Sequence, residues 1–479
     1  MSSEKGFVKE ITNMEDDFAT WYTDVVRKAE LADYTDVKGC MVIRPYGYAI
    51  WENIQKELDR RFKETGHKNA YFPLFIPESL LNKEKEHVEG FAPEVAWVTH
   101  GGSEKLEERL CVRPTSETIF STMYSKWIQS WRDLPLLINQ WANVVRWEKT
   151  TRPFLRSSEF LWQEGHTMHA TEEEAMKETL KILNIYSDFC EEFLAIPMIK
   201  GRKSEKEKFA GAEATFTIEA MMHDGKALQS GTSHYFGQGF AKAFDVKFQN
   251  KEGKEEYCYQ TSWGVSTRLI GGLIMTHGDN RGLKLPPRIA PVQVIVVPIA
   301  MHKEGVLEKA ADLAEFLKKR YRVEIDAREE YSPGYKFNEW EMKGVPIRLE
   351  IGPRDIENGE CVLVRRDTGD KITIKMTDAY DEIENVLNDI HNNMLLSAFN
   401  NRQANTFMAS NMDELKNIYE NKQGFAKAMW CGSRECEEKI KEEVGISIRC
   451  IPFEQENLGD KCVCCGNHAD NMVYMGKQY

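Results

Sequence analysis

The sequence predicts a multidomain α/β protein: an antiparallel sheet flanked by helices, then a second α/β domain, then a small cysteine-rich α/β domain. Three observations support this prediction. The chain of 479 residues is too long for one ordinary hydrophobic core. Strand-like runs outnumber helical crossovers in its first part, and several follow one another directly, which favours antiparallel pairing. A strand–helix–strand pattern and then a group of cysteines follow, so the chain changes character twice.

The composition is that of a folded protein, with 42% hydrophobic and 11% aromatic residues. Residues 1–18 lack the apolar run of a secretory signal. The most apolar stretches, such as 292–300, are too short to cross a bilayer. We therefore expect a cytoplasmic protein with no membrane partner. The net charge of −13 weighs only weakly against a nucleic-acid partner, because such binding depends on local patches of charge.

The first expected elements are two helices and a strand. Aromatic and apolar residues recur at helical spacing within 14–34, behind Thr12 and Asn13 as capping residues. A second helical pattern covers 46–64, and an apolar strand follows at 70–77. The prolines in that strand predict an edge or an interface, because proline cannot donate to a strand ladder.

The rest of the first domain alternates between strands and helices. Further strands are expected at 109–117, 137–148, 160–170, 226–237 and 255–266. Helices are expected at 116–132, 171–194 and 264–276.

The segment 285–299 marks the start of a second domain. A valine-rich strand, a helix with one apolar stripe and another strand follow one another, and this βαβ unit predicts a parallel sheet. A charged helix at 413–428 then leads into the cysteine-rich end. We expect three domains, at residues 1–287, 288–388 and 389–479.

The C-terminal cysteines have the spacing of a metal site. The chain has 11 cysteines, and in a protein that is not secreted these are thiols or metal ligands rather than disulfides. Two short-spaced pairs, Cys431 with Cys436 and Cys462 with Cys465, predict a tetrahedral structural zinc site. Cys464 is an alternative ligand. The other interpretation is a group of reduced core thiols without metal.

Residues 143–166 combine fixed charges with aromatic side chains. In a strand, Val145 and Trp147 would lie on one face and Arg146 and Glu148 on the other. More arginines, a proline and a second aromatic run follow. The pattern fits either a solvated face or a ligand face lined with charges.

Two later segments also concentrate polar groups. The segment 229–238, "QSGTSHYFGQ", places small polar side chains on a glycine-rich strand. That pattern suits close approach by a ligand, although taken alone it favours a hairpin with a satisfied histidine. In 262–280, Arg268 lies among apolar residues of a helix. Such an arginine needs an anionic partner, which is either a protein carboxylate or a phosphate.

Together these segments resemble the class II aminoacyl-tRNA synthetases. "RWE" with its arginine-rich loop is similar to their motif 2, "WGVSTRLIGGLI" to motif 3, and "YGYAIWENI…AYFPLFIP" to motif 1. The finer resemblance is to the prolyl-tRNA synthetase family, and it rests on "RPTSE", "PFLRSSEFLWQEGHT", "SEKEKFAGA", "GTSHYFGQ" and "LPPRIAPVQV" in that order. It covers nearly the whole chain, including the C-terminal zinc module and final tyrosine of the archaeal and eukaryotic type.

The resemblance implies a proline–tRNA ligase, which converts proline and ATP to prolyl-adenylate and pyrophosphate and then passes the prolyl group to tRNA(Pro). The first step needs charge neutralisation and in-line placement rather than acid–base chemistry, because the carboxylate is already a nucleophile. Arg146 and Arg268 are the implied catalytic residues, and Mg²⁺ is expected as a cofactor. The implied ATP-binding residues are Arg146, Glu148, Arg156, Ser157, Gln229, Thr232, Ser266 and Arg268.

For proline, the resemblance assigns Thr115 and Glu117 to the secondary ammonium and several aromatic and histidine side chains to the ring. A pocket of this size gains only about 1–3 kcal/mol of selectivity per methylene, so alanine and cysteine should be imperfectly excluded. The implied proline-binding residues are Thr115, Glu117, Arg146, Phe160, Trp162, Glu164, His166 and His234.

The segment between motifs 2 and 3 bears on two properties: the editing of mischarged tRNA and the closure of a lid over proline. Bacterial-type members of the family carry a long editing insertion there, whereas fewer than 100 residues separate His166 from Trp263. We therefore expect no editing in cis. Within this segment, 201–212 is by composition a charged, solvated loop with a glycine near each end. The resemblance makes it a candidate lid that orders over proline.

The second domain resembles the anticodon-binding module of this subclass. Arg348, Glu350 and Arg354 are the candidates for reading the guanines of the proline anticodon, since arginine is the usual bidentate reader of guanine. The same charges could instead form a network within the domain. A homodimer is expected through motif 1, around Pro73.

Other classes fit less well. Threonyl-tRNA synthetases place a zinc-binding cysteine where this chain has Glu117, and seryl enzymes carry an N-terminal coiled coil that is absent here. A non-catalytic paralogue would usually lose one of the two motif arginines, and both are present. A zinc hydrolase is disfavoured because four cysteines leave no open coordination position.

Overall fold

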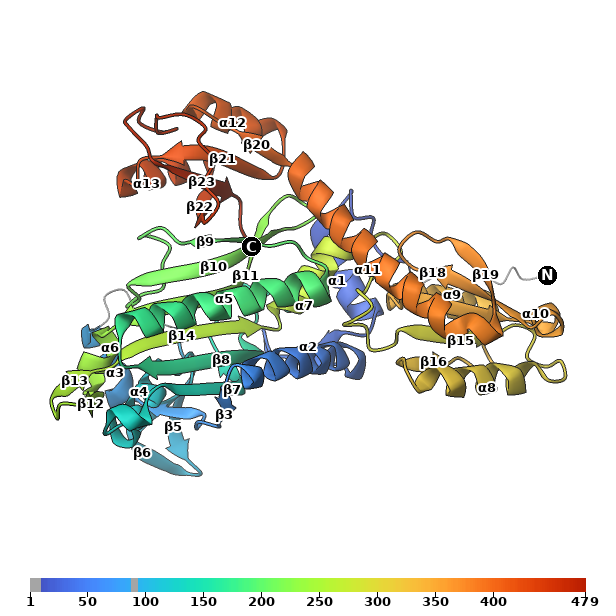
Figure 1. Ribbon diagram of the computed structural model, residues 1–479, viewed down its shortest axis with the longest axis horizontal. Helices are drawn as coiled ribbons and strands as arrows, with labels where there is room; N and C mark the ends of the chain where they lie inside the picture. The colour runs from blue at the N-terminus through green and yellow to red at the C-terminus, as the bar shows by residue number, and fades with distance from the viewer. Residues whose placement is uncertain (1–9, 88–93) are drawn as a thin grey trace.

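The structure, a computed structural model, describes residues 10–87 and 94–479 (Figure 1). Residues 1–9, which belong to the stretch expected to lack a secretory signal, lie outside the described residues. The chain forms a large sheet covered by helices, a separate α/β domain and a C-terminal module. The predicted fold class is confirmed.

The N-terminal region contains the catalytic sheet and its helices. Its helices are α1 (Phe18–Lys28), α2 (Pro45–Glu64), α3 (Glu78–His87), α4 (Glu117–Trp127), α5 (Glu172–Leu194), α6 (Gly239–Phe244) and α7 (Arg268–His277). Its strands are β1 (Ala32–Tyr34), β2 (Met41–Ile43), β3 (Lys68–Asn69), β4 (Phe75–Pro77), β5 (Trp97–Gly101), β6 (Glu104–Val112), β7 (Leu136–Val145), β8 (Glu159–His169), β9 (Ile199–Arg202), β10 (Ala214–Met221), β11 (Ala227–Gly237), β12 (Lys247–Gln249), β13 (Glu255–Tyr257) and β14 (Tyr259–Ser266).

The central strands pair antiparallel in the order β9-β10-β11-β14-β8-β7, and β3 adds a short parallel edge. Helix α5 packs along β11 and β14, as Figure 1 shows, and α7 packs against the same strands. Close packing between β8 and β14 depends on Gly165, because a Cβ at this position would lie 2.1 Å from the indole of the buried Trp263. The expectation of a mostly antiparallel sheet with helices against it is confirmed.

Several element boundaries differ from the sequence prediction. The strand expected at 70–77 is only β4, which pairs with β6 at the edge of a small sheet. Strand β7 ends at Val145. The amide of Arg146 still donates to Ser158 O just before β8 (2.8 Å), but the amide of Trp147 donates to Glu94 O instead (2.9 Å). Helix α7 begins at Arg268 rather than 264, since β14 runs to Ser266.

The cap of α1 also differs from the prediction. The side chain of Asp17, not Thr12 or Asn13, accepts from Thr20 N at the helix start. Thr12 instead donates its backbone N–H and its hydroxyl to Asp24 (2.9 and 2.8 Å). A carboxylate is a strong N-cap because it satisfies an otherwise unpaired amide at the positive end of the helix.

The second domain has a mixed sheet. Its elements are β15 (Val294–Pro298), α8 (Val306–Lys318), β16 (Val323–Ile325), α9 (Pro333–Met342), β17 (Ile347–Ile351), α10 (Pro353–Asn358), β18 (Glu360–Arg365), β19 (Lys371–Lys375) and the first half of α11 (Ala379–Ala404). Strands β16, β15 and β17 are parallel as predicted, but β18 and β19 pair antiparallel. The six-residue α10 is too short for a parallel crossover, so β18 returns beside β17.

The C-terminal module follows α11, which Figure 1 shows as a long orange helix running out of the second domain. This single helix spans residue 388, where the sequence suggested a boundary. The module contains β20 (Thr406–Met408), α12 (Met412–Asn421), β21 (Phe425–Trp430), α13 (Arg434–Val444), β22 (Ser447–Pro452) and β23 (Asn471–Gly476). Strand β22 pairs with β9, so the module extends the catalytic sheet.

The helix expected at 413–428 stops at Asn421 as α12. Gly424 then has φ +138°, and a Cβ there would lie 2.0 Å from Asn405 O, so only glycine fits. The remaining residues of the predicted helix form β21 instead.

No helix in the described ranges has both the length and the apolar character needed to cross a membrane.

Candidate active site

Alternate side chains of β8 divide between the two faces of the sheet. On one face Gln163 accepts a hydrogen bond from Tyr186 of α5 (2.6 Å), and on the other Trp162 and Glu164 line a cavity of about 420 Å³. This volume suits a small-molecule or cofactor site. The predicted residues that line the cavity are Thr115, Glu117, Arg146, Glu148, Arg156, Ser157, Phe160, Trp162, Glu164, Gln229, Thr232, His234, Ser266 and Arg268.

Among the predicted proline and ATP residues, all of which the structure describes, His166 alone does not line the cavity. Its Nε2 lies 2.8 Å from Oε2 of Glu164, and its ring stacks on Phe120 with centroids 4.1 Å apart. Strand alternation places His166 on the cavity face, but helix α4 covers it there. The expectation that His166 walls the ring is therefore corrected: it supports Glu164 from behind.

Arg146 forms one cationic wall of the cavity. Its Nε donates to Pro114 O (3.0 Å), and its guanidinium lies 5.6 and 5.5 Å from the ring centroids of Phe160 and Trp162. Burial lowers the pKa of Arg146, and Glu117 offsets part of that effect. A guanidinium stays protonated at neutral pH even so. Arg146 is thus a fixed positive charge held between aromatic rings.

Arg268 supplies a second positive charge from the first turn of α7. Its Nη2 donates to Leu155 O (3.1 Å), and burial together with Arg146 and Arg156 lowers its pKa. No carboxylate of the described residues lies within ion-pair distance of Arg268 or of Arg146. Arg156 makes a long ion-pair contact with Glu148, at 4.0 Å. Within the described residues Arg268 therefore contacts backbone carbonyls of Leu155 and Gln229 but no carboxylate.

Glu117 and Thr115 form an acidic part of the cavity wall. Thr115 Oγ1 donates to Glu117 Oε2, and Ser262 Oγ donates to Glu117 Oε1 (3.3 Å). Glu117 is the first residue of α4, where the helix dipole favours a carboxylate. The buried indole N–H of Trp162 has no acceptor among the described residues. The wall therefore offers acceptors for an ammonium group and an N–H donor for a ligand.

Glu164 is a buried carboxylate, and both of its oxygens have hydrogen-bond partners. Ser116 Oγ and Gln140 Nε2 donate to its Oε1 (2.7 and 2.8 Å), and His166 contacts its Oε2. Burial would raise the pKa of Glu164, but His166 and these hydrogen bonds outweigh it and hold this pKa below its ordinary value. Glu164 is thus a fixed negative charge near the cavity floor.

His234 is neutral at physiological pH. Burial, with a smaller effect of His166, lowers its pKa to about 3. Its Nδ1 and Nε2 lie 2.9 and 3.1 Å from the hydroxyls of Thr215 and Thr232. An uncharged ring held on both sides acts as a wall rather than as a proton carrier.

The loop between β9 and β10, residues 203–213, is named here the lid loop. Its Glu207 and Phe209 line the cavity, and the Phe209 ring lies 4.8 Å from that of His234. Phe209 N donates to Thr215 Oγ1 (2.9 Å). The sequence marked this loop as a candidate lid without assigning these side chains to the site. The aromatic Phe209 within a charged run was the available signal.

Of the three candidate anticodon residues, two are engaged within the second domain. Arg348 is buried, contacts Glu350 (2.9 Å) and Glu341 (3.2 Å), and lies 3.9 Å from the ring centroid of Phe337. The intradomain network that the sequence left open is therefore present. Arg354 on α10 is exposed and has no ion-pair partner among the described residues.

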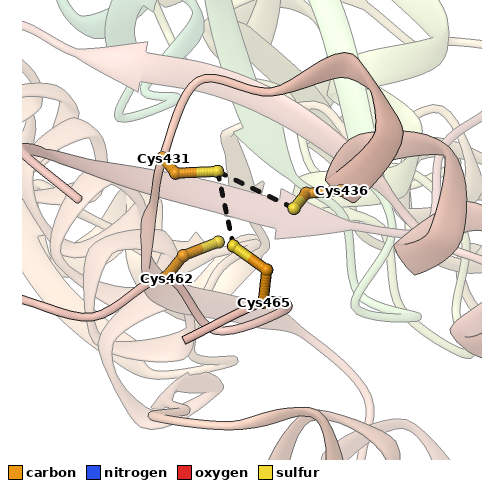
Figure 2. A group of neighbouring side chains, drawn as sticks. All are labelled: Cys431, Cys436, Cys462 and Cys465. Atoms are coloured by element: carbon orange, nitrogen blue, oxygen red, sulfur yellow. Dashed lines mark hydrogen bonds between the residues drawn. The ribbon is translucent and has the colours of Figure 1, made fainter. Parts of the chain in front are cut away.

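Figure 2 shows that Cys431, Cys436, Cys462 and Cys465 converge at one point of the C-terminal module. Their sulfurs lie within 4.8 Å of one another, with 3.7 Å from Cys431 to Cys436 and 3.8 Å from Cys431 to Cys465. Ligands about 2.3 Å from a tetrahedral zinc ion would have sulfurs about 3.8 Å apart. The four thiols fit zinc, and Cys464 lies outside this group.

The fold and the cavity define the class of the protein: it is a class II aminoacyl-tRNA synthetase. Family models match it along most of its length. They are a tRNA synthetase class II core domain (G, H, P, S and T) at residues 97–277, an anticodon binding domain at 293–386 and a prolyl-tRNA synthetase C-terminal domain at 412–479.

Comparison with individual proteins narrows the assignment from this class to one family. The chain is 65% identical over 476 residues to a proline–tRNA ligase of Alkaliphilus oremlandii, covering 99% of each chain, and 64% identical over 479 residues to one of Clostridium novyi, covering 100% of each. A crystal structure of prolyl-tRNA synthetase from Cryptosporidium parvum, complexed with halofuginone and AMPPNP, superposes with a TM-score of 0.94 at 43% identity, covering 98% of this chain and 100% of that one. The chain belongs to the prolyl-tRNA synthetase family. It is therefore an enzyme that ligates proline to tRNA, with ATP as a substrate.

Proposed function

We propose that the 420 Å³ cavity binds ATP and proline side by side, with ATP at the two arginines and proline at Glu117 and Glu164. The observation that carries this assignment is that one cavity holds both kinds of charge. Arg146 and Arg268 have no carboxylate within ion-pair distance among the described residues, whereas Glu117 and Glu164 line the same cavity and are held by hydroxyl and histidine partners. Unpaired guanidinium groups fit phosphates, and fixed carboxylates fit an ammonium.

Activation is a displacement at phosphorus. A carboxylate oxygen of proline attacks the α-phosphorus of ATP, the bond to the β-phosphate oxygen breaks, and pyrophosphate leaves with its negative charge. Arg146, between nucleotide and amino acid, neutralises charge on the α-phosphate and orients the carboxylate, and Arg268 holds the distal phosphates. Glu148, Arg156, Ser157, Gln229, Thr232 and Ser266 complete the proposed nucleotide site.

Transfer then releases AMP. The 3′-terminal hydroxyl of tRNA attacks the carbonyl carbon of prolyl-adenylate, the bond from that carbon to the phosphate oxygen breaks, and the hydroxyl proton leaves with the phosphate of AMP. Proline stays in place because Thr115 and Glu117 accept from its ammonium and Phe160, Trp162, His234 and Phe209 surround the ring. Neutral His234 adds no charge that would repel the ammonium.

Two metal ions are part of the proposal. Mg²⁺ would assist departure of pyrophosphate. No group of three or more Asp, Glu, His or Cys ligands gathers in the cavity within the described ranges, so phosphate oxygens would be its main ligands. Zn²⁺ would bind Cys431, Cys436, Cys462 and Cys465, where it stabilises the C-terminal module.

The direct test is ATP–pyrophosphate exchange with proline, threonine, alanine and cysteine. Proline should support the fastest exchange. Threonine as the best substrate would contradict the assignment of the amino-acid site, and a rate independent of any amino acid would contradict catalysis in this cavity.

We expect alanine to be activated and not edited. The ring walls exclude a smaller side chain by only about 1–3 kcal/mol per missing methylene. The segment from Thr167 to Ser262 is occupied by α5, α6 and β8–β14, which build the catalytic domain itself. Alanyl-tRNA(Pro) incubated with the pure enzyme should therefore persist as long as it does in buffer, as measured by deacylation of labelled tRNA. Rapid enzyme-dependent hydrolysis would overturn the proposed absence of editing.

For the anticodon, we expect Arg354→Ala to raise KM for tRNA(Pro) about tenfold or more, because an arginine–guanine contact contributes about 1–3 kcal/mol. ATP–pyrophosphate exchange should not change, since it does not use tRNA. Lys319→Ala, which removes an exposed cation at the end of α8, is the control. Equal effects of the two variants would show general electrostatics instead of base reading.

Two further properties, a homodimer and a cytoplasmic location, are also proposed. A homodimer through motif 1 is supported by exposed aromatic residues beside Pro73, with Tyr71 at 74% and Phe75 at 46% exposure. A cytoplasmic location is consistent with a substrate such as tRNA.

A further inference from the structure

The lid loop begins where the C-terminal module joins the catalytic sheet. Strand β22 pairs antiparallel with β9, with Ile451 opposite Arg202 and Pro452 opposite Gly201. The loop starts at the next residue, Lys203. Figure 1 shows β22 of the module beside β9. The module therefore contacts the catalytic sheet at the residues that immediately precede the lid loop.

A buried ion cluster reinforces this junction. Lys203 Nζ lies 2.6 Å from Glu219 Oε1, and Arg449 Nη2 of β22 lies 3.1 Å from Glu219 Oε2. Lys203 Nζ also donates to Arg449 O (2.8 Å), and all three side chains are at most 2% exposed. Removing one partner of such a cluster leaves an uncompensated buried charge, so the cluster resists separation.

The next residue, Ser204, connects the module directly to the turn of the lid loop. Its hydroxyl donates to Glu437 Oε1 (2.8 Å) and accepts from Glu207 N (3.3 Å). Its carbonyl accepts from Glu207 N and Lys208 N (3.1 and 2.9 Å). Both Ser204 and Glu437 are buried. The Glu437 side chain of the C-terminal module thus holds Ser204, which in turn organises the first turn of the lid loop.

Glu437 also lies next to the candidate metal site. It follows Cys436 on the first turn of α13, which Ser433 caps by accepting from Cys436 N. The four-cysteine group therefore sets the position of this helix end. At the other end of the loop, Phe209 and Glu207 line the cavity. The contacts run without a gap from the cysteines through Glu437 and Ser204 to the cavity wall.

We propose that Ser204 and Glu437 are positioning residues for proline, through which the C-terminal module holds the lid loop over the amino-acid site. The inference rests on the proposed location of proline in the cavity. It assigns the module a role in catalysis beyond folding: loss of this contact loosens Glu207 and Phe209 and weakens proline binding, while the ATP side, formed by Arg146 and Arg268, is not affected.

The test is a split between the two substrates in ATP–pyrophosphate exchange. Ser204→Ala and Glu437→Ala should each raise KM for proline about five- to tenfold, the usual effect of one buried hydrogen bond, with KM for ATP and kcat within about twofold. Glu437→Gln keeps an acceptor oxygen and should behave as the wild type. Glu442→Gln, on the exposed face of α13, is the matched control and should also be unchanged.

Two further measurements separate positioning from general damage. The double variant Ser204→Ala/Glu437→Ala should match Ser204→Ala, because the contact of Glu437 with the Ser204 hydroxyl is already lost in that single variant. Hydrogen exchange of the full-length enzyme should rise in residues 203–213 of each alanine variant, with zinc content unchanged in Ser204→Ala, which leaves the module intact.

An unchanged KM for proline in Ser204→Ala, additive effects in the double variant, or equal rises in both KM values would overturn the inference. If the wild-type enzyme showed no proline-dependent exchange, the proposed function would fail first. If the wild-type enzyme showed proline-dependent exchange but the variants kept the wild-type KM for proline, only the positioning role would fail.

Discussion

Replacing Arg146 with alanine is expected to slow proline-dependent ATP–pyrophosphate exchange about 10²- to 10³-fold. Arg146 is the cation that faces both proposed substrates, and its guanidinium is held in place by Pro114 O and the rings of Phe160 and Trp162. Because it has no carboxylate within ion-pair distance in the described part of the chain, its removal breaks no ion pair, and the hydroxyl and histidine partners of Glu117 and Glu164 remain. The melting temperature should therefore change little while kcat falls.

The neighbouring arginines provide graded controls for this prediction. Arg146→Lys keeps the charge but loses the planar contact with the rings, so its rate should lie between those of the wild type and the alanine variant. Arg156→Ala removes an exposed cation of the motif 2 loop, and about a tenfold loss or less is expected. Exchange by Arg146→Ala within threefold of the wild type would contradict the proposed role.

Loss of the candidate zinc site should have the largest effect on stability. Cys462→Ser or Cys465→Ser is expected to reduce the metal content from one zinc per chain to nearly none. Structural zinc contributes about 10–16 kcal/mol of binding free energy in small peptides, so the C-terminal module should unfold well below the melting temperature of the catalytic domain. Metal analysis and calorimetry with and without a strong chelator measure both effects.

Cys464→Ser is the matched control, because Cys464 is adjacent in sequence to Cys465 but lies outside the four-sulfur group. It should keep its zinc and its melting temperature. The reverse pattern, with zinc lost in Cys464→Ser and kept in Cys465→Ser, would show that Cys464 is the true ligand.

The sequence predicted the catalytic sheet and most residues of the cavity because both depend on local patterns. Period-two alternation in β8 and the position of Arg268 in a helix are visible within a few residues. Element ends were predicted less well. Strand β7 ends at Val145 because Trp147 N finds an acceptor in Glu94, far away in the sequence, and no local pattern records that contact.

The surroundings of individual side chains also depend on contacts that are distant in the sequence. His166 has the right alternation for the cavity wall, but Phe120 and Tyr124 of α4 cover its face of the strand. Arg348 has the right charge for a guanine, but Glu341 and Glu350 surround it. In both cases a neighbouring element that folds onto the residue changed its environment.

By itself the sequence determined the family, the class II sheet, the anticodon-type domain and the group of four cysteines, since these follow from residue types at fixed short spacings. Only the tertiary structure decided which of these residues reach the cavity, and that β22 continues the catalytic sheet and brings Glu437 to Ser204. The physical reason is burial: a polar group placed away from water must find its partner in space, and that partner lies wherever packing brings it, here more than two hundred residues along the chain.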